Sequence, residues 1–169
     1  MDKRLKIFLS TAGVLIAGGL LAILIVTSGG DSADQIGKAK MVLETNSFDF
    51  GDVSMANGKV TKTINIKNEG DADLVISKLA TSCMCTTVAL AVGDKKSPAY
   101  GMPGHGGPNG SLNETIAPGQ SGSLELIFDP NAHGPDAVGP IKRVITITSN
   151  NGGEKGSQDT ISFEGNVIK

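Results

Sequence analysis

The chain contains only two cysteines, Cys83 and Cys85, which lie one residue apart in the segment TSCMCTT. Further along, the segment GMPGHGG supplies Met102 and His105. Thiolate and thioether groups are soft ligands that suit Cu(I), and imidazole also binds copper. We therefore expect these four side chains to form a soft-metal site, with Cu(I) as the ion.

The spacing of the cysteines limits how their sulfur atoms can meet. On a β-strand, Cys83 and Cys85 would share one face and Met84 would point the opposite way. Their Cβ atoms would then lie about 6–7 Å apart, whereas a disulfide needs about 3.5–4.5 Å. A bond therefore requires a bulge or turn at Met84, and it would close a small, easily reduced ring. Two ligands of one metal ion need only approach to about 4 Å, which is easier to fit. Met84 becomes a candidate ligand only if the strand breaks there.

Two other roles for the cysteines stay open. Buried free cysteines pack like small hydrophobic residues, which would make the chain a structural or adhesion module of the cell envelope. The pair would alternatively serve thiol–disulfide exchange, although no helix N-terminus, which commonly stabilises a reactive thiolate, follows it. The sequence does not fix the position of the second histidine, His133 in DPNAHGPD. Because we find neither a hydrolase triad nor a phosphate-binding loop, we expect no enzymatic activity.

Short segments with alternating apolar and polar residues must position these side chains. In KVTKTINIKN, for example, Ile64 and Ile66 face one way while Thr63 and Lys67 face the other. Comparable segments separated by turn residues are 41–44, 47–53, 59–68, 73–80, 84–92, 121–130, 141–150 and 159–168. This pattern predicts an all-β fold, an immunoglobulin-like sandwich of about seven to eight strands over residues 40–169.

One connection, residues 93–116, is too long to be a simple turn. It reads GDKKSPAYGMPGHGGPNGSLNETI and is rich in glycine and proline. Loops longer than about 12–15 residues are usually functional or disordered. Because this loop leaves the strand that carries the cysteines, we expect its Met102 and His105 to fold back over them.

The N-terminal part differs in character from the rest. Residues 7–27 carry no charge and are long enough for a transmembrane helix, which needs about 20 apolar residues. The basic segment 1–6 predicts a cytoplasmic N-terminus. The apolar run exceeds the about 7–15 residues of a signal peptide and lacks a clean cleavage site, so we expect an uncleaved anchor. Residues 28–39 read as a flexible stalk. The chain is thus expected to be a single-pass cell-membrane protein with an extracytoplasmic main domain.

The charge distribution limits the partners of the chain. The formal net charge is −2, and aromatic residues make up only 4% of the sequence. Nucleic-acid binding typically needs a basic patch or a set of stacking aromatic residues. We therefore expect no nucleic acid as a partner, and instead the membrane, through the N-terminal helix, and an envelope protein.

Several landmarks occur in a characteristic order. They are FDFGDV, TINIKNEGDADLVI, SCMCTT, IAPGQSGSLELIFDP, VITITSN and ISFEGNV. Over residues 44–167 this order resembles the bacterial Ig-like family catalogued as domain of unknown function 1573, which is similar to the ASPM–SPD-2–Hydin and major-sperm-protein sandwiches. The family usually shows Cys-Gly-Cys-Thr, whereas this chain has Met84 in place of the glycine, and its GMPGHGG loop is longer. The resemblance implies an Ig-like sandwich and an exported or envelope-associated protein, and it implies no particular activity.

Overall fold

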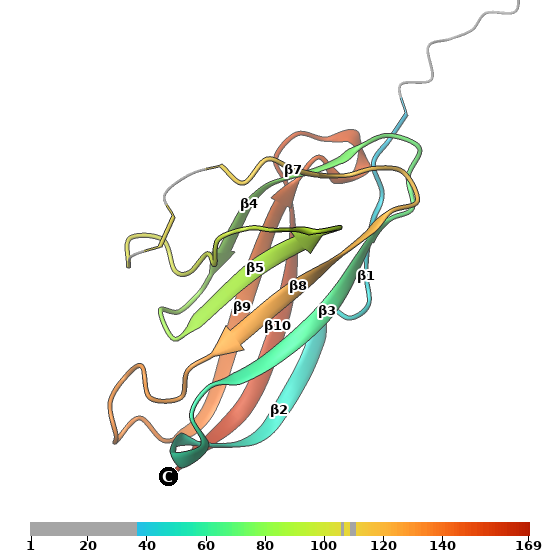
Figure 1. Ribbon diagram of the computed structural model, residues 1–169. Helices are drawn as coiled ribbons and strands as arrows, with labels where there is room; N and C mark the ends of the chain where they lie inside the picture. The colour runs from blue at the N-terminus through green and yellow to red at the C-terminus, as the bar shows by residue number, and fades with distance from the viewer. Residues whose placement is uncertain (1–36, 106, 109–110) are drawn as a thin grey trace, which may run out of the picture. The chain divides into compact units, whose positions relative to one another are not determined.

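The computed structural model describes residues 37–105, 107–108 and 111–169, which form two β-sheets packed face to face (Figure 1). The expected anchor, residues 7–27, lies outside the described residues and stays a prediction. Within the described ranges, no helix is long and apolar enough to cross a membrane. At the end of the expected stalk, Ala39 is buried in the domain.

The first sheet is antiparallel throughout. In spatial order its strands are β1 (Met41–Leu43), β3 (Val60–Asn68), β8 (Ser121–Phe128), β5 (Thr86–Val92) and β6 (Lys95–Lys96). The apolar residues of β3 and β8 alternate with polar ones, so that each strand buries one face against the second sheet.

The second sheet is antiparallel except for its edge strand β2, which runs parallel to β10. In spatial order its strands are β2 (Ser47–Ser54), β10 (Ser157–Ile168), β9 (Gly139–Ser149), β4 (Leu74–Thr81) and β7 (Glu114–Ile116). The described residues also contain two 3₁₀ turns, η1 (Met55–Asn57) and η2 (Asn151–Gly153). The expected two-sheet, immunoglobulin-like sandwich is therefore confirmed, with ten strands instead of seven to eight.

The core lies between the sheets. Its most completely buried side chains include Ile64, Ile66, Leu124, Leu126, Ile145 and Ile147. Toward the η1 end, four phenylalanines from β2, β8 and β10 form one cluster with ring centroids 5.2–6.4 Å apart: Phe48, Phe50, Phe128 and Phe163. Since aromatic rings bury large apolar areas, this cluster ties the edge strand β2 to both sheets.

The described parts of the segment 93–116 contain more regular structure than the sequence pattern indicates. The segment contains β6 and β7, and between them Tyr100 forms a bridge to Val88 through two backbone hydrogen bonds of 2.8 Å. Tyr100 is itself buried. These contacts direct the chain from the first sheet, at β6, to the second sheet, at β7.

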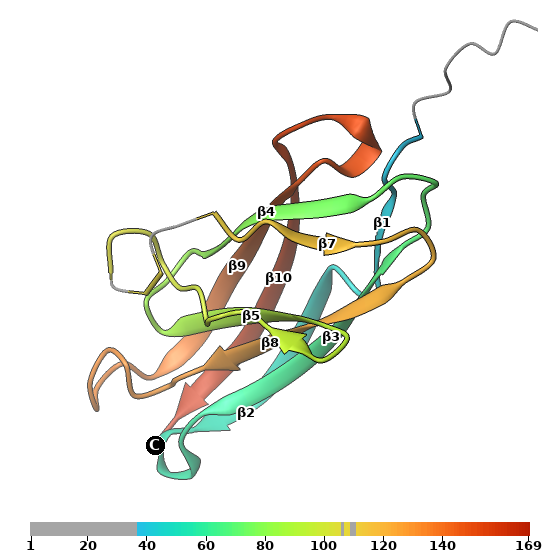
Figure 2. The same ribbon diagram turned by 45° about the horizontal axis from the view of Figure 1, so that its top comes forward.

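Two connections cross between the sheets on the same side of the sandwich (Figures 1 and 2). Residues 82–85 lead from β4 in the second sheet to β5 in the first, and residues 129–138 lead from β8 in the first sheet to β9 in the second. The amide of Asp129 donates a hydrogen bond of 2.8 Å to the carbonyl of Cys85. This arrangement brings together two segments that are far apart in the sequence.

Candidate functional site

Cys83 and Cys85 lie in a tight turn and not at the start of a strand. The amide of Thr86 donates to the carbonyl of Cys83 at 3.2 Å, and β5 begins only at Thr86. The expected strand geometry, with Met84 opposite the two cysteines, is therefore wrong. The physical reason is the crossing between sheets, because the chain must change direction between β4 and β5 within a few residues.

The turn joins the two cysteines in a disulfide, with their Cα atoms 5.3 Å apart. This agrees with the sequence argument that such a bond requires a turn at Met84. The side chain of Met84 is 48% exposed at the tip. Since the strand does break there, the condition under which Met84 becomes a candidate ligand is met.

Hydrogen bonds from β4 and β9 hold this turn in place. The hydroxyl of Thr81, which is buried, lies 2.9 Å from the carbonyl oxygen of Cys83 and 3.0 Å from that of Thr86. Ser82 donates its amide to the carbonyl of Val144 at 2.9 Å, and the amide of Val144 donates to the Ser82 hydroxyl at 2.9 Å. The disulfide therefore sits on a well-fixed backbone.

His133 is the ring that the fold brings to the cysteines. Its Nε2 atom lies 3.1 Å from Sγ of Cys83. The two sulfur atoms and a ring nitrogen of His133 all lie within 4.8 Å of one another. Hydrogen bonds of Asn131 to the side chain of Asp129, 2.9 Å, and to the carbonyl of Met55, 3.0 Å, hold the loop that carries this exposed ring. The sequence left the position of His133 open.

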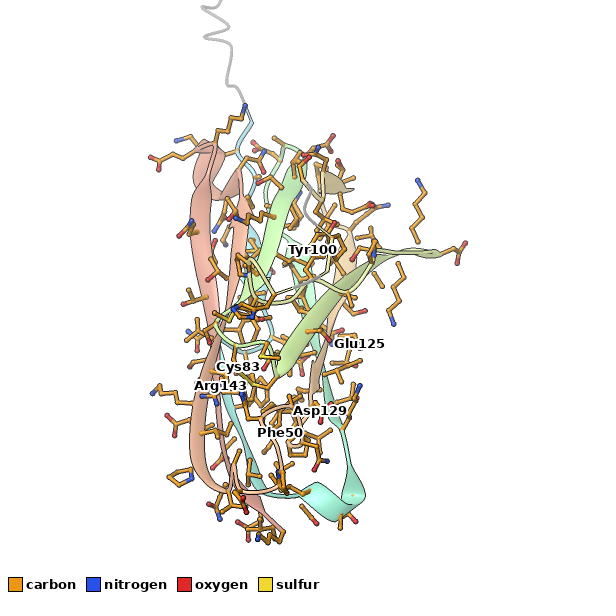
Figure 3. The ribbon with its side chains drawn as sticks, turned by 90° about the vertical axis from the view of Figure 1, so that its left-hand side faces the viewer. Phe50, Cys83, Tyr100, Glu125, Asp129 and Arg143 are labelled. Atoms are coloured by element: carbon orange, nitrogen blue, oxygen red, sulfur yellow. A yellow bond between two sulfur atoms is a disulfide. The ribbon has the colours of Figure 1, made fainter. Side chains whose placement is uncertain are left out.

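Arg143, on β9, also contacts the cysteine pair (Figure 3). Its Nε donates to Sγ of Cys85 at 3.3 Å, and its Nη1 donates to the carbonyl of Lys142 at 2.9 Å. A guanidinium beside a sulfur atom stabilises the thiolate. Arg143 is not among the site residues predicted from the sequence. The alternation on β9 carries the signal, because Arg143 shares its strand face with the buried Ile145 and Ile147.

Met102 and His105, the other two expected ligands, lie in the segment 93–116. Met102 is half-buried in a pocket lined by Ser77, Leu79 and Tyr100, among others. His105 is exposed, and its amide donates to the carbonyl of Met102 at 3.1 Å. In the described part of the chain, the group of candidate ligands around the cysteines contains His133 and does not contain His105. Beyond the bridge at Tyr100, the segment contacts β4: the carbonyl of Gly101 accepts from the amide of Thr81 at 3.2 Å, and the amide of Leu112 donates to the carbonyl of Ser77 at 2.9 Å.

The expected set of four ligands thus divides into two parts. The structure brings the two cysteines together and does not group His105 with them. The copper site in its original form, with Cys83, Cys85, Met102 and His105, stays a prediction, and the geometry offers His133 as a different nitrogen ligand. Two thiolates and one imidazole form a chemically consistent soft set.

Comparisons with solved structures show the fold. A protein of unknown function from Porphyromonas gingivalis W83 superposes with a TM-score of 0.54 at 18% identity, over 76% of this chain and 46% of that one. A family 123 glycoside hydrolase from Clostridium perfringens gives a TM-score of 0.50 at 10% identity, over 79% of this chain and 27% of that one. This chain therefore spans less than half the length of either protein. The ASH/PapD-like domain 7 of human CEP192 gives 0.46 at 10% identity, over 78% and 87% of the two chains.

Among curated proteins, none matches the sequence. Residues 41–98 match the family described as "Protein of unknown function (DUF1573)". The match runs from β1 to just beyond β6 and includes both cysteines. The resemblance expected over residues 44–167 is thus confirmed for the family, with a match confined to the first part of the sandwich. Within this segment, the chain is similar to the DUF1573 family.

Proposed function

We propose that the chain is a membrane-anchored, extracytoplasmic Ig-like module whose reduced cysteine pair binds Cu(I), with His133 as the third ligand. One observation carries this proposal: Sγ of Cys83, Sγ of Cys85 and a ring nitrogen of His133 lie within 4.8 Å of one another. Three ligand atoms converge there from two separate connections. The proposal keeps the two expected cysteine ligands and has His133 in place of Met102 and His105.

The chemistry of the three groups fits a soft monovalent ion. Reduction of the disulfide supplies two thiolates, which need to separate only to about 4 Å around one ion. Thiolates and imidazole select Cu(I) over hard ions. Two thiolates, a neutral imidazole and Cu(I) carry one net negative charge, which is costly at Cys85, a residue only 2% exposed. The guanidinium of Arg143, 3.3 Å from that sulfur, offsets the charge.

Two features support the extracytoplasmic location. Disulfides persist in oxidising compartments and are rare in the cytosol, and the cysteines here are joined. The uncharged segment 7–27, preceded by basic residues, favours an anchor with the domain outside. Copper binding by itself requires no further reacting group, so this proposed function is that of a binding protein.

Competition titration with a chromogenic Cu(I) chelator tests the proposal. The full-length chain, reduced and kept free of oxygen, should take up about one Cu(I) ion. His133→Ala should weaken binding at least about tenfold, whereas the matched control His105→Ala should leave it unchanged. Weakening by H105A alone would support the ligand set expected from sequence. Equal affinity of Cys83→Ser and the unaltered chain would reject a metal site at the pair and return the cysteines to a packing role.

A further inference from the structure

We propose that the Cys83–Cys85 disulfide is itself reactive and is passed to a dithiol of a partner protein, with Cys83 as the sulfur attacked and Cys85 as the leaving sulfur. This activity needs no metal and goes beyond the proposed copper binding. The first argument is the position of the bond. It joins residues separated by only two positions in the sequence, so it closes a minimal loop and restricts the unfolded chain very little. A bond of this kind is poorly suited to stabilising the fold.

The second argument is that the two sulfur atoms have different surroundings. Cys85 Sγ accepts a hydrogen bond from Nε of Arg143 at 3.3 Å and lies 3.7 Å from the hydroxyl of Thr86. Both contacts stabilise negative charge on this sulfur. Exchange is faster when the departing thiolate is the more stable one. Cys83 Sγ accepts a hydrogen bond from the amide of Cys85 at 3.3 Å and lies 3.1 Å from Nε2 of His133. Only Cys85 lies beside a permanently charged donor, the guanidinium of Arg143, so Cys85 is the better leaving group.

The third argument is access. Cys83 is 8% exposed and Cys85 only 2%. Ser82 and Met84, which flank Cys83, are exposed, and the Met84 side chain offers an apolar contact at the rim. The ring that adjoins Cys83 belongs to His133, which lies on an exposed loop. An incoming thiolate thus reaches Cys83 more easily than Cys85.

The exchange balances as two successive displacements. A thiolate of the partner attacks Cys83 Sγ, a new S–S bond forms, and the electron pair of the old bond leaves with Cys85 as a thiolate beside Arg143. The second thiol of the partner gives its proton to the Cys85 thiolate. The partner thiolate formed in this way attacks the partner's first sulfur atom, which is bonded to Cys83 in the mixed disulfide. Cys83 then leaves as a thiolate and takes up the proton that the partner's first thiol released. The partner loses two electrons and two protons, and the cysteine pair gains both.

The surroundings also set the direction of transfer. Groups that stabilise the reduced thiolate make a disulfide more oxidising. Arg143 stabilises the Cys85 thiolate of the reduced form. The joined cysteines are therefore the donor of the disulfide, and the partner is the dithiol that receives it. Regeneration requires a second disulfide, such as a low-molecular-weight one of the glutathione type.

Rates of reduction by dithiothreitol test the leaving-group assignment, with the full-length chain folded and a copper chelator present. Arg143→Gln should slow reduction about tenfold and shift the equilibrium in glutathione buffers toward the disulfide. The matched control is Lys142→Gln, a neighbouring exposed residue that pairs with Glu164 at 2.7 Å; it should change neither. Equal rates in the two variants, or a bond reduced only after unfolding, would overturn the proposal.

Trapping of the mixed disulfide tests the order of attack separately. When the joined pair reacts with reduced glutathione and the free thiols are then alkylated, tandem mass spectrometry should find glutathione on Cys83 and the alkyl group on Cys85. The opposite labelling would contradict the assignment. Because chelator is present throughout, a failure here leaves copper binding unaffected, and a failure of copper binding leaves exchange unaffected.

Discussion

The Nε2 atom of His133 lies 3.1 Å from Sγ of Cys83, although the two residues are 50 positions apart in the sequence. The contact exists because two connections between the sheets, residues 82–85 and residues 129–138, cross on the same side of the sandwich. The amide of Asp129, which donates to the carbonyl of Cys85, ties the two connections together. A soft-ligand group thus arises from the topology of the fold.

The hydroxyl of Thr81 should matter for both the turn and the site. Thr81→Val keeps the shape of the side chain and removes the group that lies within 3.0 Å of two buried carbonyl oxygens. We expect a loss of about 1–3 kcal/mol in the free energy of unfolding and a weaker affinity for Cu(I). Urea denaturation and chelator competition measure the two effects. Thr87→Val, on β5, is the control, and an equal effect of both substitutions would contradict the role given to Thr81.

The disulfide should contribute little to stability. The loop-closure estimate for such a short loop is about 1.5 kcal/mol. We therefore expect reduction to lower the free energy of unfolding of the full chain by no more than about 2 kcal/mol. Denaturant titrations with and without reductant measure this difference. A loss of about 4 kcal/mol or more would show that the bond is mainly a structural cross-link.

The buried amide of Asn68 should be among the most sensitive positions of the sandwich. Its Nδ2 donates to the carbonyls of Ala72 and Ile116, each at 2.8 Å, and its Oδ1 accepts from the amide of Gly70 at 2.9 Å. Asn68→Ala leaves these groups without their partner, and each unpaired buried group costs about 1–3 kcal/mol. We expect a loss of about 3 kcal/mol by thermal or chemical denaturation. Asn65→Ala, at an exposed position on the same strand, should be nearly neutral; equal losses would refute this account.

Gly122 should not tolerate a side chain. It pairs with Ile66 on one side and Val92 on the other, and a Cβ atom there would lie 2.7 Å from the carbonyl oxygen of Ala91. Gly122→Ala should destabilise the domain by about 1–3 kcal/mol because the backbone must shift. At Gly101 the nearest atom would be 3.7 Å away, so Gly101→Ala is the control. Similar melting temperatures for G122A and the unaltered chain would contradict the close packing of β5 against β8.

The expected anchor can be tested by fractionation of cells that express the full-length chain. If residues 7–27 span the bilayer, the protein should remain in the membrane fraction after washing with high salt and should be released by detergent. Deletion of residues 1–35 should move the domain into the soluble fraction. Recovery of the full-length chain in the soluble fraction would be incompatible with an anchor.

The sequence predicted the longer strands well and the site only in part. Alternation in β3, β8, β9 and β10 is strong because one face of each strand packs into the core, and those positions are buried as expected. The sequence pattern did not predict the short strands β6 and β7, because two or three residues are too few to show an alternation of apolar and polar side chains. The partner of Cys83 could not be found from spacing, because the contact with His133 depends on which connections cross on the same side. Arg143 was detectable as a charge at an inward-facing position of β9.

X-ray absorption spectroscopy at the copper edge of the Cu(I)-loaded, full-length chain tests the central claim most directly. The account predicts a three-coordinate ion with two sulfur ligands and one imidazole nitrogen, and loss of the nitrogen contribution in His133→Ala while His105→Ala keeps it. A nitrogen ligand that persists in H133A, or a copper ion bound without the sulfur atoms of Cys83 and Cys85, would contradict it.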